Sequence, residues 1–243
     1  MAEPANSTGG LDRRSRRRAQ TIDEIIAVAI EVMAQEGVAG LSLSEVARRM
    51  GIQPPSLYKY FPSKLALYDE LFKRGASEAL AAFRAAVART AVARTAVART
   101  EPGWAALTAG IEAIMRLGLD HQVAGQLLNW RPVPGFEPSA DAYAPSIELV
   151  EEIRQLLQSA ADQGELHPAA ASAEGEALLS VLIAGVMSQQ LANQPQASWD
   201  QGRFTRLTPR VLQLFQSAYP PQEACPARET SPPQETSPPQ EER

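Results

Sequence analysis

The chain has 243 residues and a mass of 26.2 kDa, with 44% hydrophobic, 21% charged and 6% aromatic residues, which suits a soluble globular protein. No run approaches about 18 consecutive apolar residues, and no apolar segment follows the N-terminal charges, so neither a membrane-spanning helix nor a secretory signal is expected. One cysteine and two histidines leave little material for a disulfide framework, a metal site or histidine-based catalysis. The composition therefore predicts a cytoplasmic protein that is not an enzyme and that has no metal, no cofactor and no membrane partner.

The net charge of −5 conceals a basic N-terminal part. Residues 11–74 carry eleven Lys and Arg against eight Asp and Glu, whereas residues 75–243 carry twelve against nineteen. Five arginines fall within six positions, namely Arg13, Arg14, Arg16, Arg17 and Arg18. The run indicates a contact with a polyanion, but read alone it fits a solvated tail equally well. We expect residues 1–18 to be a disordered basic arm.

Capping patterns predict the first two helices. Thr21 with Glu24 has the spacing of a capping box, and apolar residues then recur every 3.6 positions until Gly37. Ser42 with Glu45 repeats the pattern before a shorter helix.

A glycine and a proline pair separate that helix from a third. Gly51 ends the short helix, and the Pro54–Pro55 pair marks the first turn of the next one, which is expected to end near Pro62. Ser63 caps a long fourth helix. A helix, a short helix, a glycine turn and another short helix are the parts of a helix-turn-helix unit.

The rest of the chain is also predicted to be helical. The expected helices cover Lys64–Thr100, Trp104–Asp120, Val123–Trp130, Pro145–Gln163, Ala173–Ala192 and Gln201–Ala218. AVART occurs three times over Ala86–Thr100, and its five-residue period spreads the arginines around the helix, so it predicts no binding stripe. ETSPPQ occurs twice in residues 220–243, whose composition predicts a disordered tail.

Two motifs carry a resemblance to a known family. They are Leu41-Ser-Leu-Ser-Glu-Val-Ala-Arg-Arg-Met-Gly-Ile and Leu57-Tyr-Lys-Tyr-Phe-Pro-Ser-Lys64, and with them Thr21–Leu71 resembles the DNA-binding domain of TetR/AcrR bacterial transcriptional regulators. The resemblance implies an all-α fold, with an N-terminal three-helix helix-turn-helix DNA-binding domain at residues 19–71 and a helical-bundle ligand and dimerisation domain at 72–219. It also implies a homodimer that binds a double-stranded DNA operator and is released by a small-molecule effector.

The third helix is expected to present its outer face to the major groove. The residues exposed there would be Ser56, Tyr58, Lys59 and Tyr60, and the resemblance adds Ser44 and Pro55 near bases and Lys64 on the backbone. The arm would add Arg14, Arg17 and Arg18. Pro54 departs from the family pattern, which often has a side chain able to hydrogen-bond a base at this place. A proline can make only apolar contacts there. Tyr58 could instead pack under the first helix.

The effector domain offers weaker signals. Candidates for an apolar ligand pocket are Trp104, Met115, Leu119, Trp130, Phe136, Tyr143 and Met187, although each could be an ordinary core residue. The loop Arg131–Pro138 is a candidate pocket wall, and His121 is expected to be a surface or capping residue. The last two helices are expected to form a four-helix dimer interface through Leu182, Val186, Leu212 and Phe215, unless one of them only covers the ligand domain.

These features favour a repressor released from its operator by a small apolar ligand. Three alternatives stay open: a ligand-independent activator, a helical interaction protein whose basic arm binds acidic partners, and a helical enzyme. The last would need a titratable or nucleophilic cluster that the few His and Cys residues do not supply. Sequence preference among DNA fragments would separate the regulator from the interaction protein.

Overall fold

The computed structural model describes residues 8–95 and 103–221, which form nine α-helices and three short 3-10 helices and contain no strand. The elements in chain order are α1 Thr8–Glu36, η1 Val38–Gly40, α2 Leu43–Arg49, α3 Pro54–Leu57, α4 Lys64–Thr95, α5 Trp104–Asp120, α6 Gln122–Asn129, α7 Ala140–Asp162, η2 Pro168–Ala171, α8 Ala173–Asn193, η3 Thr205–Leu207 and α9 Thr208–Ala218. The third AVART copy, Cys225 and both ETSPPQ copies lie outside the described residues.

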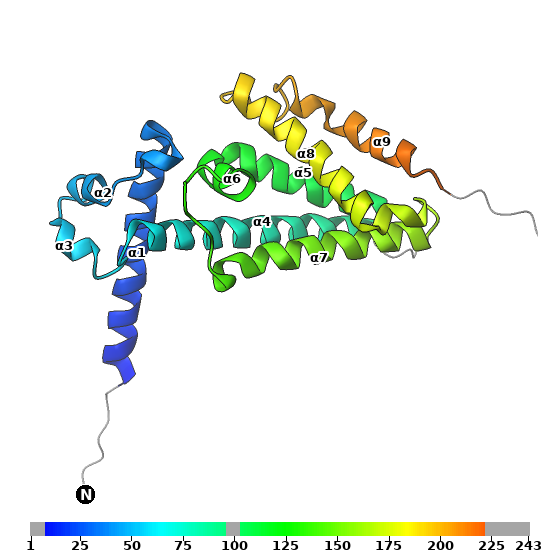
Figure 1. Ribbon diagram of the computed structural model, residues 1–243. Coiled ribbons are helices and arrows are strands. Elements are labelled where there is room, and N and C mark those ends of the chain that lie inside the picture. Colours follow the sequence, from blue (N-terminus) through cyan, green and yellow to red (C-terminus); the bar gives the residue numbers. More distant parts are fainter. Residues whose placement is uncertain (1–7, 96–102, 222–243) are drawn as a thin grey trace, which may run out of the picture.

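The first three helices, with the start of α4, form a small unit at one end of the molecule (Figure 1). Its core contains Ile25 and Ala29 from α1, Val46 from α2 and Leu57 from α3, all fully buried. α6 contributes to the same core, so this unit is joined to the rest of the chain by more than α4.

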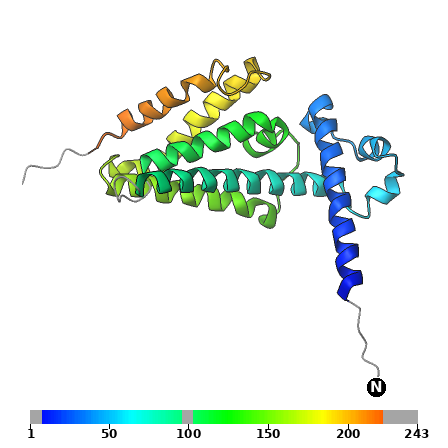
Figure 2. The same cartoon turned by 180° about the vertical axis from the view of Figure 1, so that it is seen from behind.

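The disordered arm predicted for residues 1–18 is wrong from Thr8 onward, because α1 already begins there. Thr21 lies inside the helix, and its hydroxyl donates to the carbonyl of Arg17 at 3.0 Å instead of capping a first turn. Arginine, alanine and glutamine are good helix formers and no proline interrupts residues 8–20, so the apolar stripe does not mark where the helix begins. The N-terminal half of α1 projects beyond α2 and α3 in both views (Figures 1 and 2).

The short helices agree with the sequence in position but not in every detail. Ser42 precedes α2, yet its side chain makes no capping hydrogen bond, and Glu45 binds arginines one turn on. α3 has only four residues, and Tyr58–Tyr60 continue it as a turn. Ser63 does cap α4, since its hydroxyl accepts from the Ala66 amide at 3.1 Å.

The second unit is a layered bundle. α4 packs on α5 and α7, while α8 and α9 lie together along the opposite side of α5 (Figures 1 and 2). Its core includes Phe83, Leu107 and Leu157, all fully buried.

Two helix starts differ from the prediction. α7 begins at Ala140 because Ser139 caps it, and the Asp69 carboxylate holds that serine through 2.7 Å bonds from its amide and its hydroxyl. Pro145 therefore lies inside α7. The predicted helix from Gln201 is a loop and a 3-10 turn before α9 begins at Thr208.

α8 is apolar around much of its circumference. By length and hydropathy it could cross a membrane, contrary to the expectation from counting apolar runs, although core helices of soluble proteins meet the same criterion. Only 28% of its most apolar window is buried within the chain.

A buried amide fixes the connection between α8 and α9. Gln190 is fully buried, its Oε1 accepts from the amides of Phe204 and Thr205 at 3.0 and 3.3 Å, and its Nε2 donates to the carbonyl of Gln194 at 2.8 Å. One side chain thus satisfies groups on both sides of the connection.

Replacing this amide should destabilise the fold. Gln190→Leu leaves one buried and one partly buried backbone amide without this acceptor, and we expect it to lower the free energy of unfolding by about 2–3 kcal/mol. Denaturant unfolding at one fixed protein concentration measures the change. Gln158→Leu, on the exposed face of α7, is the matched control, and equal effects of the two changes would contradict the role given to Gln190.

Candidate nucleic-acid interface and ligand cavity

A tight crossing positions α3 against α2. Gly51 adopts a φ of 66°, which favours glycine, and the amide of Ile52 donates to the carbonyl of Ala47 at 3.0 Å. Ala47 is fully buried, so a small residue lies at the crossing. The crossing leaves one side of α3 and the following turn facing outward.

Most of the residues predicted to contact DNA lie on this outer surface. Ser44 is exposed on α2, Pro55 is exposed and Ser56 half-buried on α3, and Lys59 is exposed in the turn. Tyr58 is 51% exposed, which contradicts the alternative that it packs under the first helix.

Tyr60 takes the packing role instead. Its ring is half-buried against the N-terminal core, and the guanidinium of Arg18 lies 5.2 Å from the ring centroid. Arg18 Nη1 also approaches the carbonyl of Lys59 at 3.5 Å. α1 therefore holds the turn that follows α3, and this contact was not predicted.

The arginine run lies on a helix, so its members have fixed directions. Arg14 precedes Arg18 by four residues and lies on the same face of α1, one turn farther out. Arg17 lies one position around the helix from that row. Arg14, Arg17 and Arg18 are all exposed. The row of Arg14 and Arg18 thus extends the surface formed by α3 and its turn.

Lys64 faces the core more than expected. Its Nζ donates to the carbonyl of Ala39 at 2.9 Å and lies 5.6 Å from the ring centroid of Tyr68. The Tyr68 hydroxyl donates to the carbonyl of Val38 at 2.5 Å, and burial raises the pKa of Tyr68 to about 12. These bonds tie the first turns of α4 to η1. An ammonium has three donors, so two on Lys64 stay available.

The arginines of α2 are engaged within the helix. Hydrogen bonds from Arg48 and Arg49 lower the pKa of Glu45 to about 2, and Arg49 also donates to the amide oxygen of Gln35 at 2.8 Å. Because the folded-state pKa lies below the ordinary 4.5, this stabilisation is present above pH 4.5 and is lost as the pH falls toward 2.

A cavity of about 610 Å³ lies between α4, α5, α6, α7 and α8. Of the seven predicted pocket residues, Met115, Tyr143 and Met187 line it. Its wall is largely aliphatic and aromatic, with Phe72 and Ile114 among its members. Periodicity could mark these residues as apolar but could not tell which faces of five helices converge.

The other predicted pocket residues lie elsewhere. Trp104 stacks on Phe215 with ring centroids 5.7 Å apart, and Leu119 is part of the bundle core. Phe136 packs on Tyr68, and Trp130 follows the end of α6. The loop Arg131–Pro138 contributes no residue to the cavity wall.

His121 is exposed and is the cap residue between α5 and α6, as expected, and it also lines the cavity. It lies at the junction of α5 and α6, and its Nδ1 is 3.3 Å from Oε2 of Glu78. Glu176 is a second carboxylate on the wall, and Arg154 binds both its oxygens at 2.5 and 3.1 Å.

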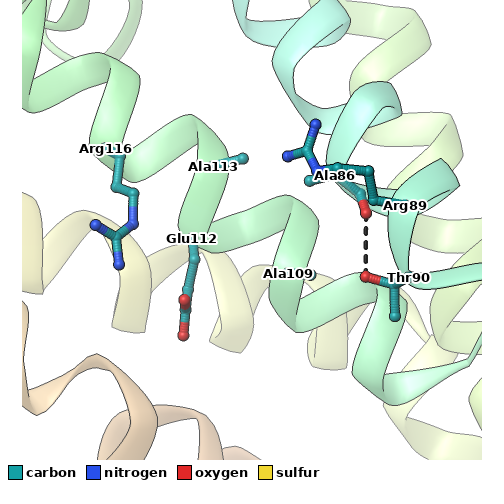
Figure 3. A pocket seen from close by; sticks show the side chains of 7 residues that line it. All are labelled: Ala86, Arg89, Thr90, Ala109, Glu112, Ala113 and Arg116. Atoms are coloured by element: carbon teal, nitrogen blue, oxygen red, sulfur yellow. Dashed lines mark hydrogen bonds between the residues drawn. The ribbon is translucent and has the colours of Figure 1, made fainter. Parts of the chain in front are cut away.

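A smaller hollow of about 400 Å³ lies between α4 and α5 (Figure 3). Arg89 reaches it from α4, and Glu112 and Arg116 from α5. The Thr90 hydroxyl donates to the carbonyl of Ala86 at 3.0 Å within α4. Arg116 also lies over the ring of Trp199, 4.6 Å from its centroid.

The predicted dimer residues are mostly covered within one chain. Phe215 is fully buried, Leu212 is 4% and Val186 8% exposed, and Leu182 is half-buried. Leu212, Phe215 and Val186 pack onto the bundle and leave little surface for a second copy, whereas the half-buried Leu182 stays a predicted interface residue.

Other apolar residues of α8 and α9 face outward. Val181 is 66% and Leu214 59% exposed, and Leu207 precedes α9 at 47%. Nothing lies within 4 Å of the position where a Cβ would stand on Gly185. The same helices therefore also carry exposed apolar residues, at positions next to the predicted ones.

Among the described residues, no group of three or more His, Cys, Asp or Glu side chains is arranged to hold a metal ion.

The N-terminal unit matches known proteins in sequence. The family model of bacterial regulatory proteins of the tetR family matches residues 25–71. The HTH-type transcriptional repressor DrrR1 of Streptomyces coeruleorubidus is 34% identical over 67 residues, which are 28% of this chain and 25% of DrrR1. The tetracycline repressor protein class A from transposon 1721 of Escherichia coli is 40% identical over 47 residues, 19% of this chain and 22% of the repressor. The aligned part thus spans about a quarter of each relative.

The fold extends the similarity to most of the chain. The TetR family transcriptional regulator PfmR from Thermus thermophilus superposes with a TM-score of 0.60 at 19% identity, covering 79% of this chain and 96% of PfmR. At this identity the likeness establishes the fold alone. Residues 25–71 therefore match the tetR family of bacterial regulatory proteins in sequence, and most of the chain shares its fold with a regulator of that family.

Proposed function

We propose that the chain is a sequence-specific DNA-binding transcriptional regulator, a homodimeric repressor that a small ligand in the large cavity releases from its operator. The observation that carries the proposal is the outward surface of α3 and its turn, with Tyr58 exposed and Arg18 of α1 bound to the same turn. A helix of this kind fits the major groove, and flanking arginines fit the phosphates.

Release by a ligand would act as a population shift. The effector would favour a state in which the two α3 helices of the dimer no longer match successive major grooves, about 34–36 Å apart. Helix α6 is placed to transmit such a shift, because Val123 and Leu127 belong to the N-terminal core while Ala124 and Leu128 line the cavity.

Selection of bound fragments from random duplex DNA tests the proposal directly. An enriched sequence with twofold symmetry is expected, and equal recovery of all sequences would favour the helical interaction protein instead. Whether the regulated promoter falls or rises in activity then separates a repressor from an activator.

Tyr58 should contribute to the affinity for DNA but little to the stability of the fold. We expect Tyr58→Ala to weaken binding to the selected operator by about 1–3 kcal/mol, because its ring reaches base edges or sugars while touching little of the core. Tyr60→Ala should lower the thermal stability as well, since that ring packs under Arg18. DNA titration at one salt concentration measures the affinity, and thermal unfolding measures the stability. If Tyr58→Ala binds the operator with wild-type affinity, α3 and its turn do not contact the bases.

The helical arginines should contribute through phosphates. Arg14→Ala or Arg17→Ala should weaken specific and random DNA alike and make the slope of log K against log salt less steep by about 0.9 for each lost contact. Arg89→Ala removes an exposed arginine at the far end of α4 and should leave the slope unchanged. If the slopes of all three variants equal the wild type, α1 makes no phosphate contact.

The outward apolar face of α8 and α9 should form the dimer. Val181→Arg or Leu214→Arg places a charge on this face, and we expect monomers that keep their helicity but lose operator binding far more than random DNA binding. Ile147→Arg, at an equally exposed position on α7, should remain dimeric. Light scattering at micromolar concentration gives the mass, and a monomeric wild type would overturn the two-half-site mechanism.

A further inference from the structure

We infer that the large cavity takes an apolar organic cation, a hydrocarbon or aromatic body carrying one protonated amine, and discriminates against carboxylates of similar size. The inference rests on the proposed role of the cavity as an effector site and names the chemical class of the effector.

The volume and the lining of the cavity indicate that most of the ligand is apolar. Its volume of about 610 Å³ falls within the range of pockets that bury drug-sized ligands, roughly 300–1,000 Å³. Phe72, Ile114, Met115 and Ile183 represent a wall that is mostly aliphatic and aromatic. Burial of an apolar body there supplies affinity without fixing its orientation.

The charges on the wall exclude an anion. Neither Lys nor Arg occurs among the described residues that line the cavity, whereas two carboxylates do, Glu78 and Glu176. The nearest guanidinium to Glu176, that of Arg154, is bound to both oxygens of that carboxylate and to Glu151 at 2.7 Å. A ligand carboxylate would therefore lose its hydration and gain no free cation.

His121 does not change this balance. Its Nδ1 lies 3.3 Å from Oε2 of Glu78, so any positive charge on the imidazole faces that carboxylate first. Its Nε2 can still donate one hydrogen bond to a ligand, but an imidazolium paired with Glu78 adds no net positive charge to the wall.

Glu78 is the group that would receive a cation. Arg154 occupies both oxygens of Glu176, whereas the contact of Glu78 with the imidazole is longer, at 3.3 Å, and involves one carboxylate oxygen. The Glu78 side chain is 55% exposed and also lines the cavity, so it lies at the mouth, and an amine bound there keeps contact with water while the apolar body enters the cavity. A protonated amine has three donors and can bind the carboxylate without disturbing Arg154.

Three probes that share one chain and differ in the head group test the inference: decylammonium, decanol and decanoate. Calorimetric titration of the DNA-free wild-type protein, below the micelle concentration of each probe, gives the affinities. We expect decylammonium to bind about tenfold or more tighter than decanoate, with decanol between them, because a hydrogen bond to a charged group adds to the burial of the chain. Equal or tighter binding of decanoate, or no binding of any probe, would overturn the inference.

A pair of variants tests whether the ammonium group of the probe binds at Glu78. Glu78→Gln should bring the affinity ratio of decylammonium to decanol close to one. Glu112→Gln removes a carboxylate from the smaller hollow, outside this cavity, and should keep the wild-type ratio. Thermal unfolding of both variants without probe verifies that they are folded. A ratio that survives in Glu78→Gln, or falls in Glu112→Gln, would overturn the assignment of Glu78.

These measurements involve no DNA, so they are independent of the proposed release. If the protein binds a selected operator but rejects decylammonium, the ligand class fails and the proposed function does not. If decylammonium binds with the expected ratio but no duplex is selected, the opposite holds.

Discussion

Helix α6 has eight residues and borders both the N-terminal core and the large cavity, and the proposed communication between the two units depends on this constraint. Val123 and Leu127 are buried with α1, η1 and the start of α4, whereas Ala124 and Leu128, on the adjacent face, line the large cavity. A helix this short has no length over which to absorb a change on one side, so a movement of the cavity wall must be met in the N-terminal core or resisted by it. Close-packed interiors respond to such a change by switching between arrangements rather than by deforming smoothly.

Small residues let α6 occupy this position. A Cβ on Gly125 would stand 2.7 Å from the carbonyl oxygen of Gly118, so α6 approaches the backbone of α5 as closely as a glycine allows. On α4, a Cβ on Gly75 would meet the Cβ of Ala124 at 3.1 Å. Both contacts border the cavity. The helix is therefore seated firmly on α4 and α5, and a ligand that separates these helices would act on α6 first.

The sequence predicted the helix order and the helix-turn-helix unit because those features depend on local patterns. Residues close together in the sequence are enough to recognise the glycine turn at Gly51, the cap at Ser63 and the 3.6-residue stripe of α1. The start of α1 was missed because the basic residues before Thr21 carry no apolar stripe, although they are good helix formers. Local patterns show that a residue is apolar but not which residue it packs against.

The pocket and interface residues that were misplaced have that second cause. Trp104 and Phe215 are both large and apolar, and they satisfy each other in a stacked pair between residues far apart in the sequence, which no periodicity reveals. His121 was placed at a helix junction correctly, but its cavity contact depends on Glu78, one helix away. Sequence reasoning therefore located the helices that build each site and misjudged which side chains those helices turn inward.

α8 illustrates the consequence for function. Met187 and Ile183 of this helix line the cavity, while Val181 and Gly185 face outward with no cover from the described part of the chain. Neighbouring residues of one helix thus serve the ligand wall and the surface proposed to hold a second copy. A ligand that tilts α8 would shift that surface along with α6, so the spacing of the two α3 helices would respond both through the joint at α6 and through the dimer contact. In the proposed dimer both routes would change the distance between the two α3 helices, and a modest displacement at each would suffice to lose the match with successive major grooves.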